Sequence, residues 1–449
     1  MDFSKDREIL GIALPALGTL AADPLLSMVD TAMVGHLGAA PLAALGISTV
    51  AFSMVFVVFN FLAYGTTGPF ARLAAAGRTD DAVRHVVQAL WVAVLLGLVS
   101  TFAGLVLSRP IGYLLGARGT VLVLFLAYFR IRILALTPML IVLVGHGLFR
   151  GLLDTRTPLA ITVGANAVNA LLGFILIYPV GLGVRGAAIG TVVAQTGACA
   201  LFARQMWRRL HPVAPPGAWR PHRGAMRGLL RLSRDLLIRT FSLNGVFVVS
   251  TAVATRMGTT VVAGHQVAME LWMFLAMVLD SIAIAGQALT GRYLGAGMTG
   301  ESVRTAKRML LWGVAFGAAL GGAYWLTRDL LPRIFTNDRA VIAGVAIVLP
   351  FLAAFQPLNG FVFVLDGILI GASDARFLAR GMVLSAGATI PIVLLSLRYD
   401  WGLRGIWAGL SLFMVLRAVT NGVRFRSGRW LRGGARVGVA PSEAPQARG

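Results

Sequence analysis

The sequence has few of the residues that soluble, disulfide-linked or metal-binding proteins depend on. Cys199 is the single cysteine among 449 residues, so an intramolecular disulfide and a cysteine metal cluster are both excluded. Charged residues make up only 13% of the chain, and Lys5 and Lys307 are its only lysines. A chain with so few charges cannot cover a soluble globule of this size with polar surface.

The sequence contains instead apolar segments that are long enough to cross a bilayer. Hydrophobic residues make up 57% of the chain, and the mean hydropathy is +0.79. A helical span needs about 20 apolar residues, so we predict an all-α polytopic membrane protein with twelve transmembrane helices. The helices are expected near residues 8–33, 42–73, 85–108, 119–149, 158–179, 184–207, 226–255, 262–293, 305–326, 338–370, 377–397 and 402–423.

A repeat at a constant offset of 220 residues divides these spans into two halves. The offset pairs Arg72 with Arg292 and Asp154 with Asp374, and further matches extend over more than a hundred residues. Matches at one offset over such a length indicate a duplicated unit rather than chance in a biased composition. Because six spans per copy let both copies enter the membrane from the same side, we expect two six-helix lobes related by a pseudo-twofold axis along the membrane normal.

The formal net charge of +22 comes mainly from arginines at the ends of the apolar segments. They are densest between residues 204 and 239, around a Pro-rich segment at 211–217. We interpret this cluster as a cytoplasmic linker that follows the positive-inside rule, in preference to a site for nucleic acid or anionic lipid. Both termini would then be cytoplasmic, in a bacterial-type inner membrane. The predicted organisation is an N-terminal lobe at 1–210, the linker at 211–225, a C-terminal lobe at 226–430 and a disordered cytoplasmic tail at 431–449.

Acidic residues are rare inside the apolar segments, and Asp30 follows an apolar run within the first of them. A charge inside a membrane span usually marks a pathway or a site. Several motifs resemble the multidrug and toxic compound extrusion (MATE) family, and its DinF branch in particular. They are the run 21–38 with Asp23 and Asp30, the motif 147–158 (GLFRGLLDTRTP), and Arg234-Asp235 with Arg239.

The resemblance implies a secondary active antiporter, not an enzyme, that exports amphiphilic and cationic organic compounds in exchange for protons. Rocking of the two lobes would give alternating access. Two alternatives stay open, namely sodium coupling within the same family and a lipid-linked precursor flippase of the wider superfamily. A membrane-embedded transferase is disfavoured, because the sequence has no aspartate cluster, histidine–carboxylate pair or metal-ligand spacing.

The resemblance assigns cation coupling in the N-terminal lobe to Asp30. Desolvation disfavours the charged form of a buried carboxylate, so proton occupancy of Asp30 is expected to follow its exposure to either side. Asp23, two helical turns earlier on the same face, is a candidate relay partner. Asn169 matches a polar position that the family uses beside this acid, and Asn166 shares its helix face. Gly173 stands where the family usually has a further acid, which favours protons over sodium as the coupling ion.

The second lobe offers three candidate contacts for substrate or a second cation, Asp280, Gln287 and Glu270. Asp280 and Gln287 are seven residues apart and share a helix face, whereas Glu270 precedes Asp280 by ten residues. The alternative for Asp280 is a structural ion pair with Arg239 or Arg292.

Met269 and Trp272 belong to a set of methionines and aromatic residues that could line an adaptable pocket, although core packing explains such residues equally well. Arg130 and Arg132, inside the fourth apolar segment, are expected to have a structural role. We expect no metal and no cofactor beyond the coupling ion. The expected partners are small-molecule substrates and the lipid bilayer, without nucleic acid, and the chain is expected to be a monomer.

Overall fold

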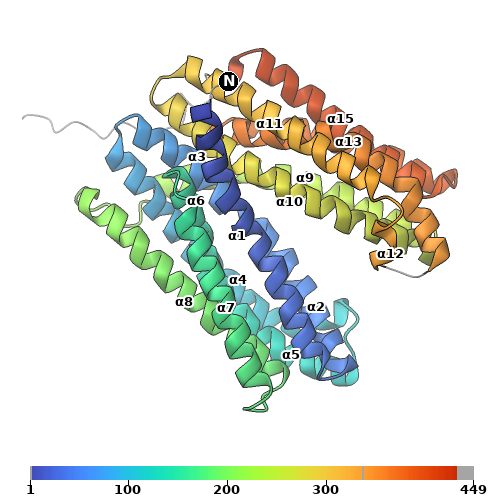
Figure 1. Cartoon of the computed structure of the whole chain (residues 1–449). Helices are drawn as coiled ribbons and strands as arrows, with labels where there is room; N and C mark the ends of the chain where they lie inside the picture. Colours follow the sequence, from blue (N-terminus) through green and yellow to red (C-terminus); the bar gives the residue numbers. More distant parts are fainter. Residues whose placement is uncertain (1–2, 336–337, 432–449) are drawn as a thin grey trace, which may run out of the picture. The chain divides into compact units, whose positions relative to one another are not determined.

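The computed structural model describes residues 3–335 and 338–431, and helices account for nearly all of them (Figure 1). Twelve helical segments are long and apolar enough to cross a membrane, which confirms the predicted all-α polytopic class. The first half contains α1 (Phe3–Gly35), α2 (Ala39–Phe56), η1 (Val57–Asn60), α3 (Phe61–Ala75), α4 (Thr79–Leu114), α5 (Gly119–Arg132), η2 (Ile133–Ala135), α6 (Leu136–Gly151), α7 (Arg156–Ile177) and α8 (Val184–Leu210). The second half contains η3 (His211–Val213), α9 (Arg223–Arg256), α10 (Thr259–Gly295), α11 (Thr299–Leu326), α12 (Leu331–Phe335), α13 (Arg339–Gly371), α14 (Ala375–Arg398) and α15 (Gly402–Arg426).

The backbone carries the predicted repeat at the turns between helices. Gly38 and Gly258, which are 220 residues apart, both have φ of 120°, a conformation that only glycine adopts without strain. Leu153 and Ser373 are separated by the same offset and have φ of 62° and 60°, although neither is glycine. Because non-glycine residues rarely adopt positive φ, the same exception at equivalent positions supports duplication of the chain independently of residue identity.

The described residues form two units by their internal contacts. Their boundaries differ from those of the predicted lobes near the beginning of α1 and near the beginning of α9. One unit takes residues up to 17 together with those from 232 onward, and the other takes 18–231. The first turns of α1 therefore belong with the second half, and the first turns of α9 belong with the first half. The predicted boundaries at 210 and 225 stay a prediction, and residues 432–449 of the predicted tail lie outside the described residues.

Polar contacts hold the beginning of α1 in the unit that contains α10 and α11. Arg308 donates to both carboxylate oxygens of Asp6, over 2.7 and 2.6 Å, and Trp312 donates to the same carboxylate over 2.8 Å. Glu8 accepts from Arg292 over 3.2 Å. Bidentate, charge-assisted bonds of this kind fix orientation as well as distance.

The beginning of α9 is held in the other unit through the preceding segment. Gln88 of α4 donates to the carbonyl of Arg220 over 2.9 Å and accepts from the backbone N–H of His222 over 2.7 Å. Trp91, one turn further along α4, donates to the carbonyl of Trp219 over 3.0 Å. The predicted linker is therefore an ordered segment that is tied to α4.

Glycine allows α11 and α13 to pack backbone against backbone. Gly313, Gly317 and Gly321 form a small-residue stripe on α11, a pattern that brings membrane helices close together. A Cβ placed on Gly360 of α13 would lie 2.0 Å from the carbonyl oxygen of Gly313. Neither backbone can move away without separating the two helices.

We expect Gly360→Ala to lower the free energy of unfolding by about 1–3 kcal/mol, the usual cost of overpacking a close interface. Thermal unfolding of the protein in lipid nanodiscs would measure the change. Gly322→Ala is the matched control, because a Cβ on Gly322 of α11 meets nothing within 4 Å. Equal stability of the two variants would contradict the inferred backbone contact.

Candidate functional site

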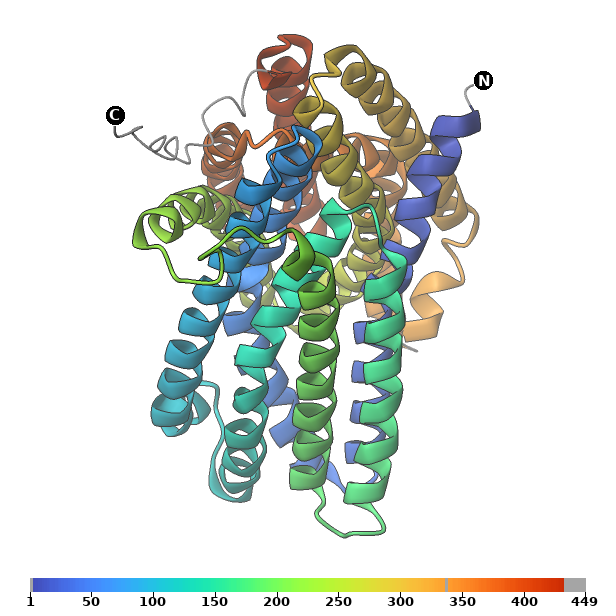
Figure 2. The ribbon, with the colours of Figure 1, turned by 90° about the vertical axis from the view of Figure 1, so that its left-hand side faces the viewer.

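The predicted residues of the first lobe form two acid–amide pairs between α1 and α7. Asn169 donates to the two carboxylate oxygens of Asp30 over 3.4 and 3.3 Å. Asn166 donates to Asp23 over 3.5 Å. All four residues belong to the unit of residues 18–231. Figure 2 shows how α7 is placed, as one arm of a hairpin with α8.

The burial of these pairs differs. Asp30 is half-buried and Asn169 is only 1% exposed, whereas Asp23 is exposed and Asn166 is half-buried. A relay between the acids would have to span about 10.5 Å along α1, the rise of two helical turns. Each carboxylate therefore has its own amide donor on α7, Asn166 for Asp23 and Asn169 for Asp30.

The amide of Asn169 suits a carboxylate that changes its protonation state. An ionised carboxylate only accepts hydrogen bonds, whereas a protonated one also donates. The Nδ2 of Asn169 serves the ionised form, and its Oδ1 is buried without a hydrogen-bond partner in the described part of the chain. A rotation of the amide by half a turn would present that oxygen to a protonated Asp30.

Arg132 lies beside this site. From the sequence, Arg130 and Arg132 were expected to need partners, either acids of the core or the membrane edge, and a structural role was favoured. The Arg132 guanidinium is 4.2 Å from the ring centroid of Phe52 and 3.7 Å from the sulfur of Met139. The charge of Arg132 also acts on both Asp23 and Asp30. Arg132 therefore places a positive charge near both carboxylates.

Gly173, where the family usually has a further acid, lies close to Met33 of α1 and to the backbone of α8. A Cβ at this position would lie 3.0 Å from the terminal methyl group of Met33. Gly190 of α8 packs against the backbone of Gly173, where its own Cβ would lie 3.0 Å from the Gly173 nitrogen. A side chain at position 173 would need only a small shift of the flexible end of Met33.

The three candidates of the second lobe lie along one helix. Glu270 is exposed and accepts a hydrogen bond of 2.9 Å from Gln266, one turn earlier on α10. Asp280 is half-buried and Gln287 is buried. At 1.5 Å per residue, Glu270 and Gln287 are separated by about 25 Å, so the three side chains cannot hold a single ion together.

The predicted arginine partners of Asp280 form ion pairs with other acids. Arg292 pairs with Glu8, and Arg239 donates to Asp366 of α13 over 2.5 Å. Arg417 of α15 donates to the same carboxylate oxygen of Asp366 over 2.6 Å. Asp366 and Arg239 stand out in the sequence as a polar group of the second lobe and as part of a family motif, but their pairing with Arg417 does not, because Arg239 and Arg417 are separated by 178 residues.

Comparison with known proteins finds a family match in each half of the chain. A family model described as MatE matches residues 15–175 and 236–395. Protein DETOXIFICATION 44, a chloroplastic protein of Arabidopsis thaliana, is 33% identical over 438 residues, which cover 94% of this chain and 83% of that protein. DNA damage-inducible protein F of Escherichia coli strain K12 is 29% identical over 447 residues, which cover 95% of this chain and 94% of that protein.

Solved structures with the same fold include an outward-facing multidrug resistance MATE family transporter of the MOP superfamily. It superposes with a TM-score of 0.86 at 20% identity and covers 96% of this chain and 97% of that one. The Vibrio cholerae MATE transporter VcmN in its bent form superposes with the same TM-score, 0.86, at 18% identity. The match covers 96% of this chain and 97% of that one. At this identity the likeness shows the shared fold.

Proposed function

Because this chain belongs to the MATE family of multidrug efflux transporters, we propose that it is an antiporter that exports amphiphilic, cationic organic compounds in exchange for protons. Like other members of the family, it is a transporter and not an enzyme. Rocking of its lobes would expose the site alternately to the two sides of the membrane.

The observation that carries the proposal is the half-buried Asp30 opposite the buried amide of Asn169. A proton needs one carboxylate, and the Asn169 amide offers a donor to the ionised form and an acceptor to the protonated one. A sodium ion would need several oxygen ligands around it, and this chain has Gly173, which has no side chain, where the family usually has a further carboxylate. A cationic substrate and a proton would compete for the same negative charge, which is the basis of exchange.

We further propose that the protein acts as a monomer in a bacterial-type inner membrane, with both termini in the cytoplasm. The arginine-rich segment around residues 204–239 supports this orientation through the positive-inside rule. Its partners would be small-molecule substrates and lipid, without nucleic acid and without an organic cofactor.

Separate ion gradients across proteoliposome membranes test the coupling. We expect ethidium to accumulate in vesicles with an acidic lumen, because protons that leave would drive the cation inward. A sodium gradient of the same direction, at equal pH on both sides, is expected to give only the uptake of protein-free vesicles. Uptake driven by sodium and insensitive to a protonophore would establish the sodium-coupled alternative and overturn proton exchange.

A further inference from the structure

The duplicated halves of the chain differ in the partner of one arginine. Arg292, in the last turn of α10, donates to the carboxylate of Glu8 over 3.2 Å, and Tyr293 donates to the same carboxylate over 2.8 Å. Arg72 has the equivalent position in the last turn of α3. Its Nη1 is buried and has no hydrogen-bond partner among the described residues. Because buried polar groups normally have a partner, the difference between the halves calls for a physical explanation.

The first turns of α9 are the counterpart of the first turns of α1. The two helices begin at positions that are 220 residues apart. The first turns of α9 belong to the unit of residues 18–231, which also contains α3. A Cβ on Gly65 of α3 would lie 4.0 Å from a terminal methyl carbon of Leu229. The beginning of α9 therefore packs along α3, the helix that ends with Arg72.

The acid that would pair with Arg72 is missing from α9. The 220-residue offset places Gly228 where α1 has Glu8, and Met226 where α1 has Asp6. A Cβ on Gly228 would meet no atom within 4 Å, so there is space beside this position. Arg72 thus lacks the carboxylate that its counterpart has, and the replacement by glycine leaves room for another anion.

The charges on this part of α9 are positive. Arg223 and Arg227 are both exposed, and the first turn of the helix contains no acid. Of the two acids at the start of α4, Asp80 is exposed and Asp81 forms an ion pair with Arg78 over 2.7 Å. A cluster of like charges raises the local concentration of ions of the opposite sign, so this region attracts anions.

We propose that Arg72 binds a phosphate-type oxyanion in the space beside Gly228, at the position that Glu8 takes against Arg292. We call this position the Arg72 site. A guanidinium group forms paired, charge-assisted hydrogen bonds with phosphate oxygens as it does with a carboxylate. The headgroup phosphate of an anionic phospholipid and free inorganic phosphate both present such oxygens, and the positive charge of α9 favours either of them over a zwitterionic headgroup.

Thermal unfolding of the full-length protein in maltoside micelles, which contain no phosphate, tests the Arg72 site. Inorganic phosphate is titrated at constant ionic strength in one series, and phosphatidylglycerol is added to the micelles in another, with phosphatidylcholine as the reference lipid. We expect a saturable rise in the unfolding temperature, because an anion that binds only the folded protein stabilises it. A rise with inorganic phosphate identifies the free ion as a ligand, and a rise with phosphatidylglycerol identifies the headgroup.

Two outcomes of these titrations would overturn the proposal. One is the lack of a saturable rise with both inorganic phosphate and phosphatidylglycerol. The other is a response to phosphatidylcholine that equals the response to phosphatidylglycerol, without any response to inorganic phosphate.

Arg72→Gln tests the role of the arginine. We expect the apparent anion affinity to fall at least tenfold. Without added anion the unfolding temperature should not fall, because the variant removes an uncompensated charge. Arg118→Gln is the matched control, at an exposed arginine of the same unit whose guanidinium donates to the carbonyls of Tyr113 and Ala117. Equal anion affinities of Arg72→Gln and Arg118→Gln would contradict the assignment to Arg72.

A carboxylate introduced on α9 should replace the anion. Without added anion, we expect Gly228→Glu to unfold about 1–3 °C above Gly228→Gln, and we expect it to lose the response to phosphate and to phosphatidylglycerol. Gly228→Gln is the reference because glutamine has a similar size and helix propensity but no charge. Equal unfolding temperatures of the two variants, with an undiminished anion response of Gly228→Glu, would overturn the placement beside Gly228.

The two substituted positions give independent answers. Gly228→Glu keeps the test decisive if Arg72→Gln fails to fold. None of the measurements uses an ion gradient, so their outcome does not depend on the proposed proton exchange.

Discussion

Replacement of Asp30 by asparagine is expected to reduce proton-driven ethidium exchange to the level of protein-free vesicles while the protein stays folded. Asparagine has nearly the shape of aspartate but cannot take up or release a proton near neutral pH. Within the described ranges, the Asp30 carboxylate accepts two long hydrogen bonds, both from Asn169, so the change in the free energy of unfolding should stay within about 1 kcal/mol. Exchange in proteoliposomes and thermal unfolding of the same preparation give both readouts.

Two further carboxylate variants separate a role of Asp30 from a general loss of charge. Asp23→Asn removes the exposed acid, which has a single bond of 3.5 Å to Asn166, and we expect partial exchange to remain. Asp329→Asn, at an exposed acid, should exchange like the native protein. Full proton-driven exchange by Asp30→Asn would remove this residue from the mechanism.

The largest expected loss of stability follows from removing the carboxylate of Asp366. Asp366→Ala would leave the guanidinium groups of Arg239 and Arg417 buried next to each other, with side chains only 12% and 3% exposed. Breaking a buried ion pair from one side costs about 3–5 kcal/mol, because the remaining charge is uncompensated. We expect a marked fall in unfolding temperature, measured by tryptophan fluorescence in nanodiscs.

A second variant and a surface control support this interpretation. Asp366→Leu combined with Arg417→Met leaves a single guanidinium, and it should recover a large part of the stability that Asp366→Ala loses. Asp81→Asn removes the half-buried partner of the exposed Arg78, for which the expected cost is below about 1 kcal/mol. If Asp366→Ala and Asp81→Asn unfolded at the same temperature, the buried cluster would not stabilise the protein.

The helices and their duplication were predictable because they depend on local composition and on a repeat within the sequence. Long apolar segments determine the twelve spans, and Gly38 and Gly258 mark equivalent turns. The unit boundaries were not predictable, since residues 1–17 group with the second half through contacts such as Asp6 with Arg308, which are 302 residues apart. Such contacts leave no periodic signal in the sequence.

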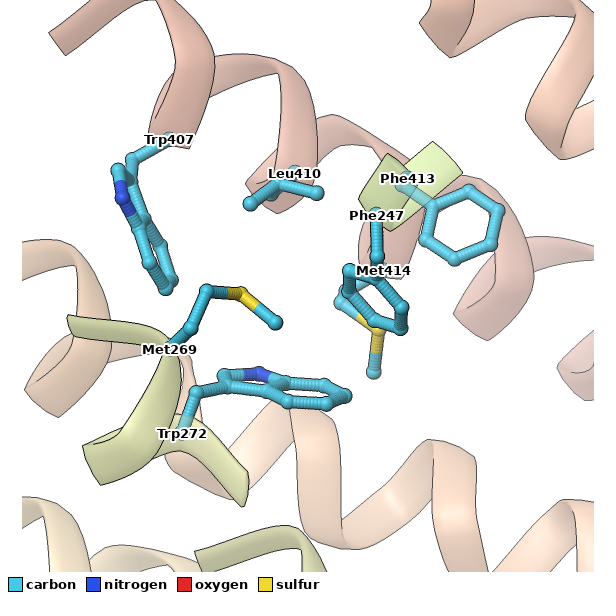
Figure 3. A pocket seen from close by; sticks show the side chains of 7 residues that line it. All are labelled: Phe247, Met269, Trp272, Trp407, Leu410, Phe413 and Met414. Atoms are coloured by element: carbon cyan, nitrogen blue, oxygen red, sulfur yellow. The ribbon is translucent and has the colours of Figure 1, made fainter. Parts of the chain in front are cut away.

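The candidate site was predictable where the family motifs and helix spacing indicated a residue. Asp30 and Asn169 lie together as the resemblance implies, although their coupling role stays a prediction. Arg417 was missed, because an arginine near the end of an apolar segment resembles one that follows the positive-inside rule. Arg132 was recognised as an arginine inside an apolar segment, but its place beside Asp23 and Asp30 was not predicted. Of the methionines and aromatic residues, Met269 and Trp272 line a pocket (Figure 3), but spacing alone could not distinguish them from core residues.

The first turns of α1 group with the second half of the chain and the first turns of α9 with the first half, which suggests how this chain evolved. A single-copy ancestor with the same contacts would have placed the beginning of its first helix in a second copy, as a domain-swapped homodimer. Fusion through the segment before α9 would turn that dimer into one chain and keep residues 1–17 grouped with those from 232 onward, as they are in this chain. A gene cut at this segment should therefore give halves that are stable only when they are produced together, because the second half alone would lack Asp6 against Arg308 and Trp312.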